Sequence, residues 1–244
     1  MKRRTFIQQA GLGTIALAGF SGFSFAGFEE TFTEAMLTGK GNDQLVGTNI
    51  QMMKETQTAF EKMKNEAAKE GIIIQIVSAY RSYQRQNQIW ERKYNQFTQE
   101  GLTPIDAIYK IIEYSTIPGT SRHHWGTDID IIQQTVSPVE NPLHEKHFHG
   151  NGKFCLLKEW LDKYSEDFGF YEVYTNNPAR KGFKYEPWHF SYAPLSIPML
   201  KAYKKLDFKN IIFHNNIKGN SNFTEEFISN YYNQNILDVN KALV

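Results

Sequence analysis

"SRHHWGTDIDI", residues 121–131, combines two histidines with two aspartates in one short stretch. Gly126 lies between the two pairs and allows the backbone to turn there. The following residues, "TDIDII", alternate polar and apolar side chains, which is typical of a strand with one buried face. Because side chains on a strand have a period of two, Asp128 and Asp130 share one face and the isoleucines the other. The pattern predicts an acidic, site-facing surface above an apolar core.

Histidine and aspartate in this arrangement are candidate metal ligands. A hydrolytic metal site needs three protein ligands, an open position for water and a base beside that water. His123 and Asp130 can supply two ligands. The third must come from a distant segment, and His189 in "EPWHFSY" is the best candidate, with Glu186 three positions earlier. Positions i and i+3 of a regular strand face opposite ways, so Glu186 and His189 converge only if Pro187 introduces a turn or bulge.

The remaining chain mixes helices and strands without a regular βαβ rhythm. Apolar spacing predicts helices at residues 51–69, 83–99, 103–114, 154–165, 195–205 and 223–233. Strands are predicted at residues 72–77, 127–132, 168–174 and 184–192, with loops at 133–152 and 175–182. We therefore predict an α+β fold in which a small, mainly antiparallel sheet is packed by helices and carries the metal site on its face.

Composition excludes several classes of protein. The 244 residues suit one core, and the 18 Phe, 13 Tyr and 4 Trp supply both core packing and side chains for a ligand groove. A net charge of +1 without a long basic run argues against a nucleic-acid partner. The single cysteine, Cys155, excludes a disulfide within the chain. After residue 30 no stretch is long and apolar enough to span a membrane.

Residues 1–26 have the pattern of an export signal. Three basic residues at positions 2–4 precede a short, weakly apolar run, and Ser24–Ala26 provide a small-x-Ala cleavage pattern. The paired arginines followed by Phe and Ile resemble a twin-arginine signal, although ordinary secretory signals and membrane anchors are alternatives. We expect export to the periplasm or cell envelope, with residues 27–48 forming a loosely structured lead-in to the mature domain.

Three separated blocks carry a family resemblance. They are "SAYRSYQRQ" at residues 78–86, the Ser-x-His-x-x-Gly-x-x-x-Asp pattern at 121–130, and Glu-x-Trp-His at 186–189. In this order they resemble the zinc metallopeptidases that include VanY-type D-alanyl-D-alanine carboxypeptidases, within the group that also contains lysostaphin and sonic hedgehog. The resemblance spans roughly residues 72–192. We expect residues 49–244 to form a single zinc peptidase domain with a C-terminal helical tail.

The resemblance also implies a ligand set and a base. In this family His123, Asp130 and His189 would bind Zn²⁺, which is the cofactor that we expect. Glu186 would act as the general base and later donate the proton to the leaving amine.

Three further residues would act on the substrate. Arg81 would stabilise the oxygen that gains negative charge, or would grip the terminal carboxylate; its planar guanidinium suits either task. Ser121 and Gln86 would orient the substrate.

Some residues of the motifs leave alternatives open. The family usually has a small apolar residue where this chain has Asp128. The additional acid can tune the metal, contact a substrate amine or lie at a solvated edge; we favour the solvated edge and leave Asp128 out of the ligand set. His124 competes with His123, but the family spacing selects His123, so we expect His124 to point away.

The histidine-rich stretch "HEKHFHG" contains His144, His147 and His149. It lies in a loop rich in proline and asparagine, and no pattern positions an acid there as a base. We interpret it as a solvated loop or an opportunistic metal binder that borders the cleft.

The resemblance implies an exported, zinc-dependent peptidase that hydrolyses D-Ala-D-Ala-type amide bonds in peptidoglycan stem peptides. Alternatives with the same site are an endopeptidase or a D,D-dipeptidase. A non-catalytic, metal-containing cell-wall binding module is a further alternative, but it would not need a base such as Glu186. We expect a monomer with no nucleic-acid partner and no stable membrane span after signal cleavage.

Overall fold

A computed structural model describes residues 32–213 and 216–244. The export signal expected at residues 1–26 lies outside the described residues, as does the beginning of the lead-in. The α-helices are α1 (Glu34–Leu37), α2 (Lys54–Lys69), α3 (Tyr83–Gln99), α4 (Pro104–Ile111), α5 (Cys155–Tyr164), α6 (Ala193–Tyr203), α7 (Phe208–Phe213) and α8 (Glu225–Tyr231). The strands are β1 (Leu45–Val46), β2 (Met52–Met53), β3 (Ile74–Ser78), β4 (Asp128–Gln133), β5 (Phe170–Glu172) and β6 (His189–Tyr192). Short helical turns η1 to η6 cover Arg122–Trp125, Glu145–His147, Ser165–Phe168, Asn220–Asn222, Tyr232–Ile236 and Lys241–Leu243.

Four of the strands form one antiparallel sheet in the order β3-β4-β6-β5, and β1 pairs separately with β2. The central pair, β4 and β6, joins two of the sequence motifs. Its register sets Asp130 opposite His189 and Asp128 opposite Ser191. Because directly paired residues project from the same side of a sheet, this pairing gathers their side chains on one face. The α+β fold with a small antiparallel sheet is confirmed.

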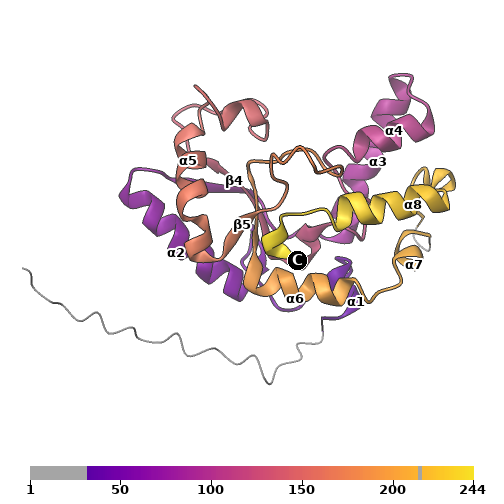
Figure 1. The fold of residues 1–244 in the computed structure, drawn as a ribbon, viewed down its shortest axis with the longest axis horizontal. Helices are drawn as coiled ribbons and strands as arrows, with labels where there is room; N and C mark the ends of the chain where they lie inside the picture. The colour runs from indigo at the N-terminus through magenta and orange to yellow at the C-terminus, as the bar shows by residue number, and fades with distance from the viewer. Residues whose placement is uncertain (1–31, 214–215) are drawn as a thin grey trace, which may run out of the picture. The chain divides into compact units, whose positions relative to one another are not determined.

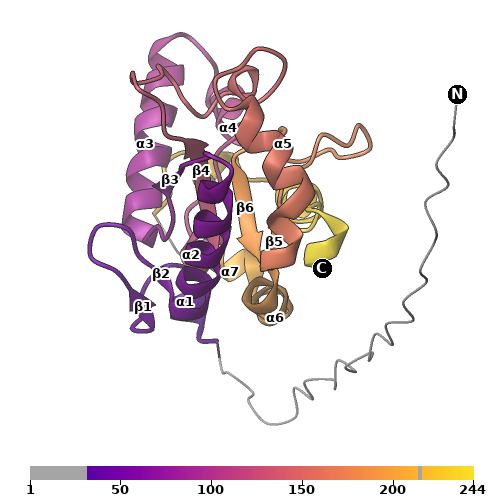
Figure 2. The same ribbon diagram turned by 90° about the vertical axis from the view of Figure 1, so that its left-hand side faces the viewer.

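The opposite face of the sheet is apolar and is covered by α2 and α5 (Figures 1 and 2). Phe60, Met63 and Ala67 lie on one side of α2 at helical spacing and are buried. They pack in one cluster with Ile129 and Ile131 of β4. The alternating "DIDI" side chains therefore point to opposite faces of β4 as predicted, with the isoleucines in the core and the acids on the site face.

A second apolar core lies among α3, α4, α6 and α8 (Figure 1). The C-terminal helix α8 is tied to the segment before the "SRHHW" motif by Tyr231. Its hydroxyl accepts a hydrogen bond from Ile117 N–H at 2.9 Å and lies 2.8 Å from Thr120 Oγ1. The C-terminal part of the chain therefore helps to hold in place the segment that leads into "SRHHW".

The observed elements differ from expectation in a few places. The strand expected at 184–192 begins only at His189, because the two residues before it form a turn. The short helix α7 was not predicted. Part of the lead-in expected at 27–48 contains α1 and β1, and Leu37 is fully buried. None of the helices in the described residues is both long and apolar enough to span a membrane.

Candidate metal centre

The turn η1 presents His123 to the site face. Ser121 caps this turn, with its Oγ accepting from His123 N–H at 3.3 Å, and Gly126 ends it with a φ of +71°. His123 Nδ1 lies 2.7 Å from the carbonyl oxygen of Ala79 and therefore donates to it. The lone pair of Nε2 is then free, and this atom lies 3.4 Å from Asp130 Oδ2.

A turn at Pro187 brings Glu186 beside His189. His189 N–H donates to the Glu186 carbonyl oxygen at 3.0 Å, and Glu186 Oε2 lies 2.9 Å from His189 Nδ1. The turn that the chemistry required is confirmed. Glu186 is buried, and burial raises the pKa of its carboxyl.

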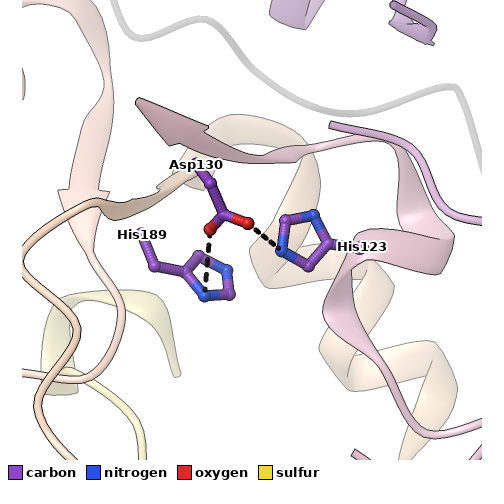
Figure 3. A group of neighbouring side chains, drawn as sticks. All are labelled: His123, Asp130 and His189. Atoms are coloured by element: carbon purple, nitrogen blue, oxygen red, sulfur yellow. Dashed lines mark ion pairs between the residues drawn. The ribbon is translucent and has the colours of Figure 1, made fainter. Parts of the chain in front are cut away.

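His123, Asp130 and His189 converge on one point. One candidate ligand atom from each lies within 4.8 Å of the other two, and Figure 3 shows the Asp130 carboxylate between the two rings. Within residues 32–213 and 216–244 this is the one such cluster of three or more potential metal ligands. Asp130 Oδ1 is buried without a hydrogen-bond partner among the described residues, which leaves a position that a cation would satisfy. Two imidazoles and a carboxylate fit a divalent ion such as zinc.

The surrounding charges keep Asp130 ionised. Burial alone would raise the pKa of this carboxyl. The electrostatic interactions with His123, His189 and Arg81 lower it by more, so the net pKa lies below the ordinary value.

Asp128 lies at the site, although the favoured sequence interpretation placed it at a solvated edge. It is fully buried, so the interpretation as a solvated edge residue was wrong. Its Oδ2 lies 2.9 Å from His189 Nε2 and accepts from Arg122 Nε at 3.0 Å. Its Oδ1 accepts from the hydroxyls of Ser191 at 2.6 Å and Thr127 at 3.0 Å. The position of Asp128 on the face of the other ligands was the available signal.

His124 is held by backbone groups on both ring nitrogens. Its Nε2 accepts from Gly119 N–H at 3.1 Å, so its Nδ1 is protonated and donates to the Arg81 carbonyl oxygen at 2.6 Å. Burial lowers the pKa of His124 to about 3. The prediction that His124 points away from the ligand position is confirmed.

Arg81 lies next to the cluster and is held in place from behind. Its Nη2 lies 3.9 Å from Asp130 Oδ2 and donates to Ser78 Oγ at 3.0 Å, while Nη1 donates to Gln86 Oε1 at 2.9 Å. Gln86 is fully buried and donates to the Thr116 carbonyl oxygen at 2.8 Å. The amide of Gln86 is therefore connected to the site through Arg81.

A cleft of about 530 Å³ opens beside the three candidate ligands. Arg81, Ser121 and Glu186 line it, so these predicted site residues share one space. Aromatic side chains form part of its wall: Tyr114, Tyr174, Phe183 and Trp188. The arrangement combines a potential ion site, a buried carboxylate and a cation in a groove that can hold an extended chain.

Comparison with known proteins now decides the family. A family model described as "VanY: D-alanyl-D-alanine carboxypeptidase" matches residues 49–195. The chain belongs to this family. The match covers all three blocks that carried the resemblance, which is therefore confirmed.

Curated relatives of this VanY-family chain include D-alanyl-D-alanine carboxypeptidases of two enterococci. The Enterococcus faecalis protein is 27% identical over 127 residues, which make up 52% of this chain and 42% of that relative. The Enterococcus faecium protein is 26% identical over 153 residues, 62% of this chain and 40% of that relative. The chain spans less than two thirds of the length of the curated relatives that it matches.

Solved structures share the fold. VanYB in complex with D-alanine-D-alanine matches with a TM-score of 0.53 at 20% identity, covering 68% of this chain and 86% of that chain. A variant of the vancomycin-resistance D,D-pentapeptidase VanY in complex with Zn(II) matches with a TM-score of 0.51 at 21% identity, covering 70% and 90%. At these identities the likeness shows the VanY fold.

The histidine-rich loop borders the VanY-type cleft without forming a second cluster. His144 lines the cleft, whereas His149 Nε2 lies 3.0 Å from the hydroxyl of Tyr185. The three histidines of this loop do not form a metal-binding cluster in the part of the chain that the structure describes.

Helix α3 adds a cationic wall that sequence reasoning missed. Arg92 and Lys93 line the cleft, and Lys93 Nζ donates to Ser115 Oγ at 2.7 Å. Burial lowers the pKa of Lys93. Lys93 follows Gln86 by seven positions, two helical turns, and this spacing was the signal that could have identified it.

Proposed function

We propose that the chain is a zinc-dependent carboxypeptidase that removes the last residue from peptidoglycan stem peptides ending in D-Ala-D-Ala. The observation that carries the proposal is the convergence of His123, Asp130 and His189 with Glu186 at the edge of a cleft. Membership of the VanY family and the names of its enterococcal relatives support the substrate class. The VanY structure in complex with Zn(II) supports zinc as the ion.

Glu186 is the proposed proton carrier. When bound, zinc would polarise a carbonyl oxygen and lower the pKa of water. Glu186 would take the proton from the attacking water and later deliver it to the amine that leaves. Burial raises the pKa of Glu186 towards the range in which one carboxyl can act as base and then as acid.

Two cations would each stabilise a different negative group of the substrate during the reaction. Arg81 lies beside Asp130 and would stabilise the carbonyl oxygen as it becomes negative. Lys93, on the wall of the cleft, would bind the terminal carboxylate of the substrate. Gln86 would act by fixing the guanidinium of Arg81, and Ser121 would orient the peptide at the cleft wall.

Residues 1–26 would direct the chain to the cell envelope, where peptidoglycan lies. Replacing both Arg3 and Arg4 with lysine should retain the protein inside the cell if the twin-arginine route is used. Cell fractionation followed by immunodetection measures this, and unchanged export would exclude that route.

Mass spectrometry of synthetic stem peptides tests the activity. We expect the purified protein to release a single alanine from a pentapeptide ending in D-Ala-D-Ala and to leave the L-Ala-terminated peptide intact. Cleavage of free D-Ala-D-Ala would instead indicate a dipeptidase, and cleavage of cross-linked dimers an endopeptidase.

Glu186→Gln should keep one equivalent of zinc and lose at least about 100-fold in kcat, because the proton carrier is removed. His189→Ala should lose most of the zinc, measured by atomic emission after gel filtration. Equal turnover by Glu186→Gln would refute the base, and unchanged zinc in His189→Ala would refute that ligand.

A further inference from the structure

Asp128 is a buried anion whose four closest polar contacts come from side chains. Both oxygens have two such contacts: Arg122 and His189 at Oδ2, and Ser191 and Thr127 at Oδ1. Arg122 also donates from Nη2 to Ser191 Oγ at 2.7 Å, which closes a ring of contacts around the carboxylate. A carboxylate with this many donors is fixed in orientation.

The contact between Asp128 and His189 determines which nitrogen of His189 faces the site. An ionised carboxylate only accepts hydrogen bonds, so Nε2 at 2.9 Å must carry a proton. Nδ1 faces the site and also lies 2.9 Å from Glu186 Oε2, so it is the nitrogen that can bind an ion once any proton shared with that carboxyl has left. This atom is the one that lies 3.8 Å from Asp130 Oδ1, on the side of the cluster.

The network is built on three different elements and is buried. Asp128 comes from β4, Ser191 from β6 and Arg122 from η1, and each is buried. The guanidinium of Arg122 lies over the ring of Trp125, with Cζ 4.6 Å from the ring centroid. Because the residues that contact Asp128 belong to different packed elements, the orientation of its carboxylate is set by packing as well as by hydrogen bonds.

We propose that Asp128 is a positioning residue that selects the tautomer of His189 and fixes its ring for the metal ion. The inference rests on the proposed zinc site and assigns a role to a residue that the family motif does not require. Hydrogen bonds to the second nitrogen of a metal-binding histidine typically change metal affinity by about 10- to 100-fold. The rival explanation is that Asp128 only neutralises the buried charge of Arg122.

The experiment compares zinc dissociation constants, measured in competition with a chromophoric chelator. Asp128→Asn should weaken zinc binding by about 10- to 100-fold, because an amide is a poorer acceptor and can also present a donor to Nε2. The double variant Arg122→Gln with Asp128→Asn removes both buried charges, so it leaves no unpaired ion and should stay folded. It should bind zinc as weakly as Asp128→Asn does.

The matched control is Thr127→Val, which removes a donor to Asp128 Oδ1 but leaves the contact with His189. Its zinc affinity should stay close to that of the wild type. Cobalt substitution gives an independent readout, since altered ligand geometry shifts the visible absorption bands in Asp128→Asn and leaves them unchanged in the control. Chemical unfolding of the metal-free proteins measures the structural effect separately.

Two outcomes would overturn the inference while the proposed function stands: wild-type zinc affinity in Asp128→Asn, or recovery of wild-type affinity in the double variant. The second would show that Asp128 acts only on Arg122. Failure of the wild type itself to bind zinc would overturn the proposed function, and the inference with it.

Discussion

At the scale of a residue, His124 shows how the fold can fix a protonation state. Its ring is fully buried. One ring nitrogen donates a hydrogen bond to a backbone carbonyl oxygen, and the other accepts one from a backbone N–H. A second proton would leave Gly119 N–H without an acceptor and would place a charge in the core. Burial therefore lowers the pKa of His124 to about 3.

This state makes stability depend on pH. In the unfolded chain His124 takes up a proton below its ordinary pKa of about 6.5, but in the folded chain it does so only near pH 3. Between these values the unfolded state binds more protons, so stability falls as the pH is lowered from 6.5, by about 1.4 kcal/mol per unit for this group. Urea unfolding at several pH values measures the slope.

His124→Gln provides the comparison for that slope. The variant should be less stable at pH 7 but should lose less stability between pH 6.5 and 5, because the titrating ring is absent. Carboxylates that titrate in both proteins cancel in the difference. Parallel slopes for wild type and variant would contradict the prediction.

At the scale of an element, α8 supports a motif that precedes it by about a hundred residues. The family match ends at residue 195, yet Tyr231 of α8 binds the segment that leads into the site. Phe227 stacks on Tyr231 and on Phe223, so the helix is anchored by aromatic packing. The backbone N–H of Ile117 would lack its partner without this helix.

Tyr231→Phe tests this support with a single atom. Removing the hydroxyl leaves the buried Ile117 N–H unpaired, so the free energy of unfolding should fall by about 1–3 kcal/mol. Tyr232→Phe, at the neighbouring half-buried position, should change it by less than about 0.5 kcal/mol. Denaturant unfolding followed by circular dichroism compares the two, and equal effects would argue against a role for the hydroxyl.

Sequence predicted those elements whose pattern is local. The alternation in "TDIDII" placed Asp130 on the site face, and the need for convergence predicted the turn at Pro187. Asp128 was misjudged because its partners, Arg122 and Ser191, meet it only after η1 folds back and β6 pairs with β4. Contacts between elements leave no periodic signal in the sequence. The cations of α3 were missed for another reason, since the seven-residue spacing of Lys93 from Gln86 already places both residues on one side of a helix.

At the scale of the whole molecule, the cleft is assembled from segments that are far apart in the sequence. The sheet supplies Asp130 and His189, and η1 supplies His123. Helix α3 supplies Arg92 and Lys93, and the loop at residues 143–145 borders the space. Arg81, Arg92 and Lys93 line this space together with the acids Asp130 and Glu186. A substrate with a negative end would be oriented by that charge distribution before any chemistry begins.

Lys93→Gln tests the orientation. Without this cation the KM for a peptide with a free C-terminal carboxylate should rise by about 10-fold, because a charge-assisted hydrogen bond of about 1.5 kcal/mol is lost. The KM for the C-terminally amidated peptide should change little, since that substrate has no charge for Lys93 to bind. Steady-state kinetics on both peptides, with Lys62→Gln on the exposed surface of α2 as the control, separates the local effect from net charge. An equal rise of KM for both peptides would contradict recognition of the carboxylate by Lys93.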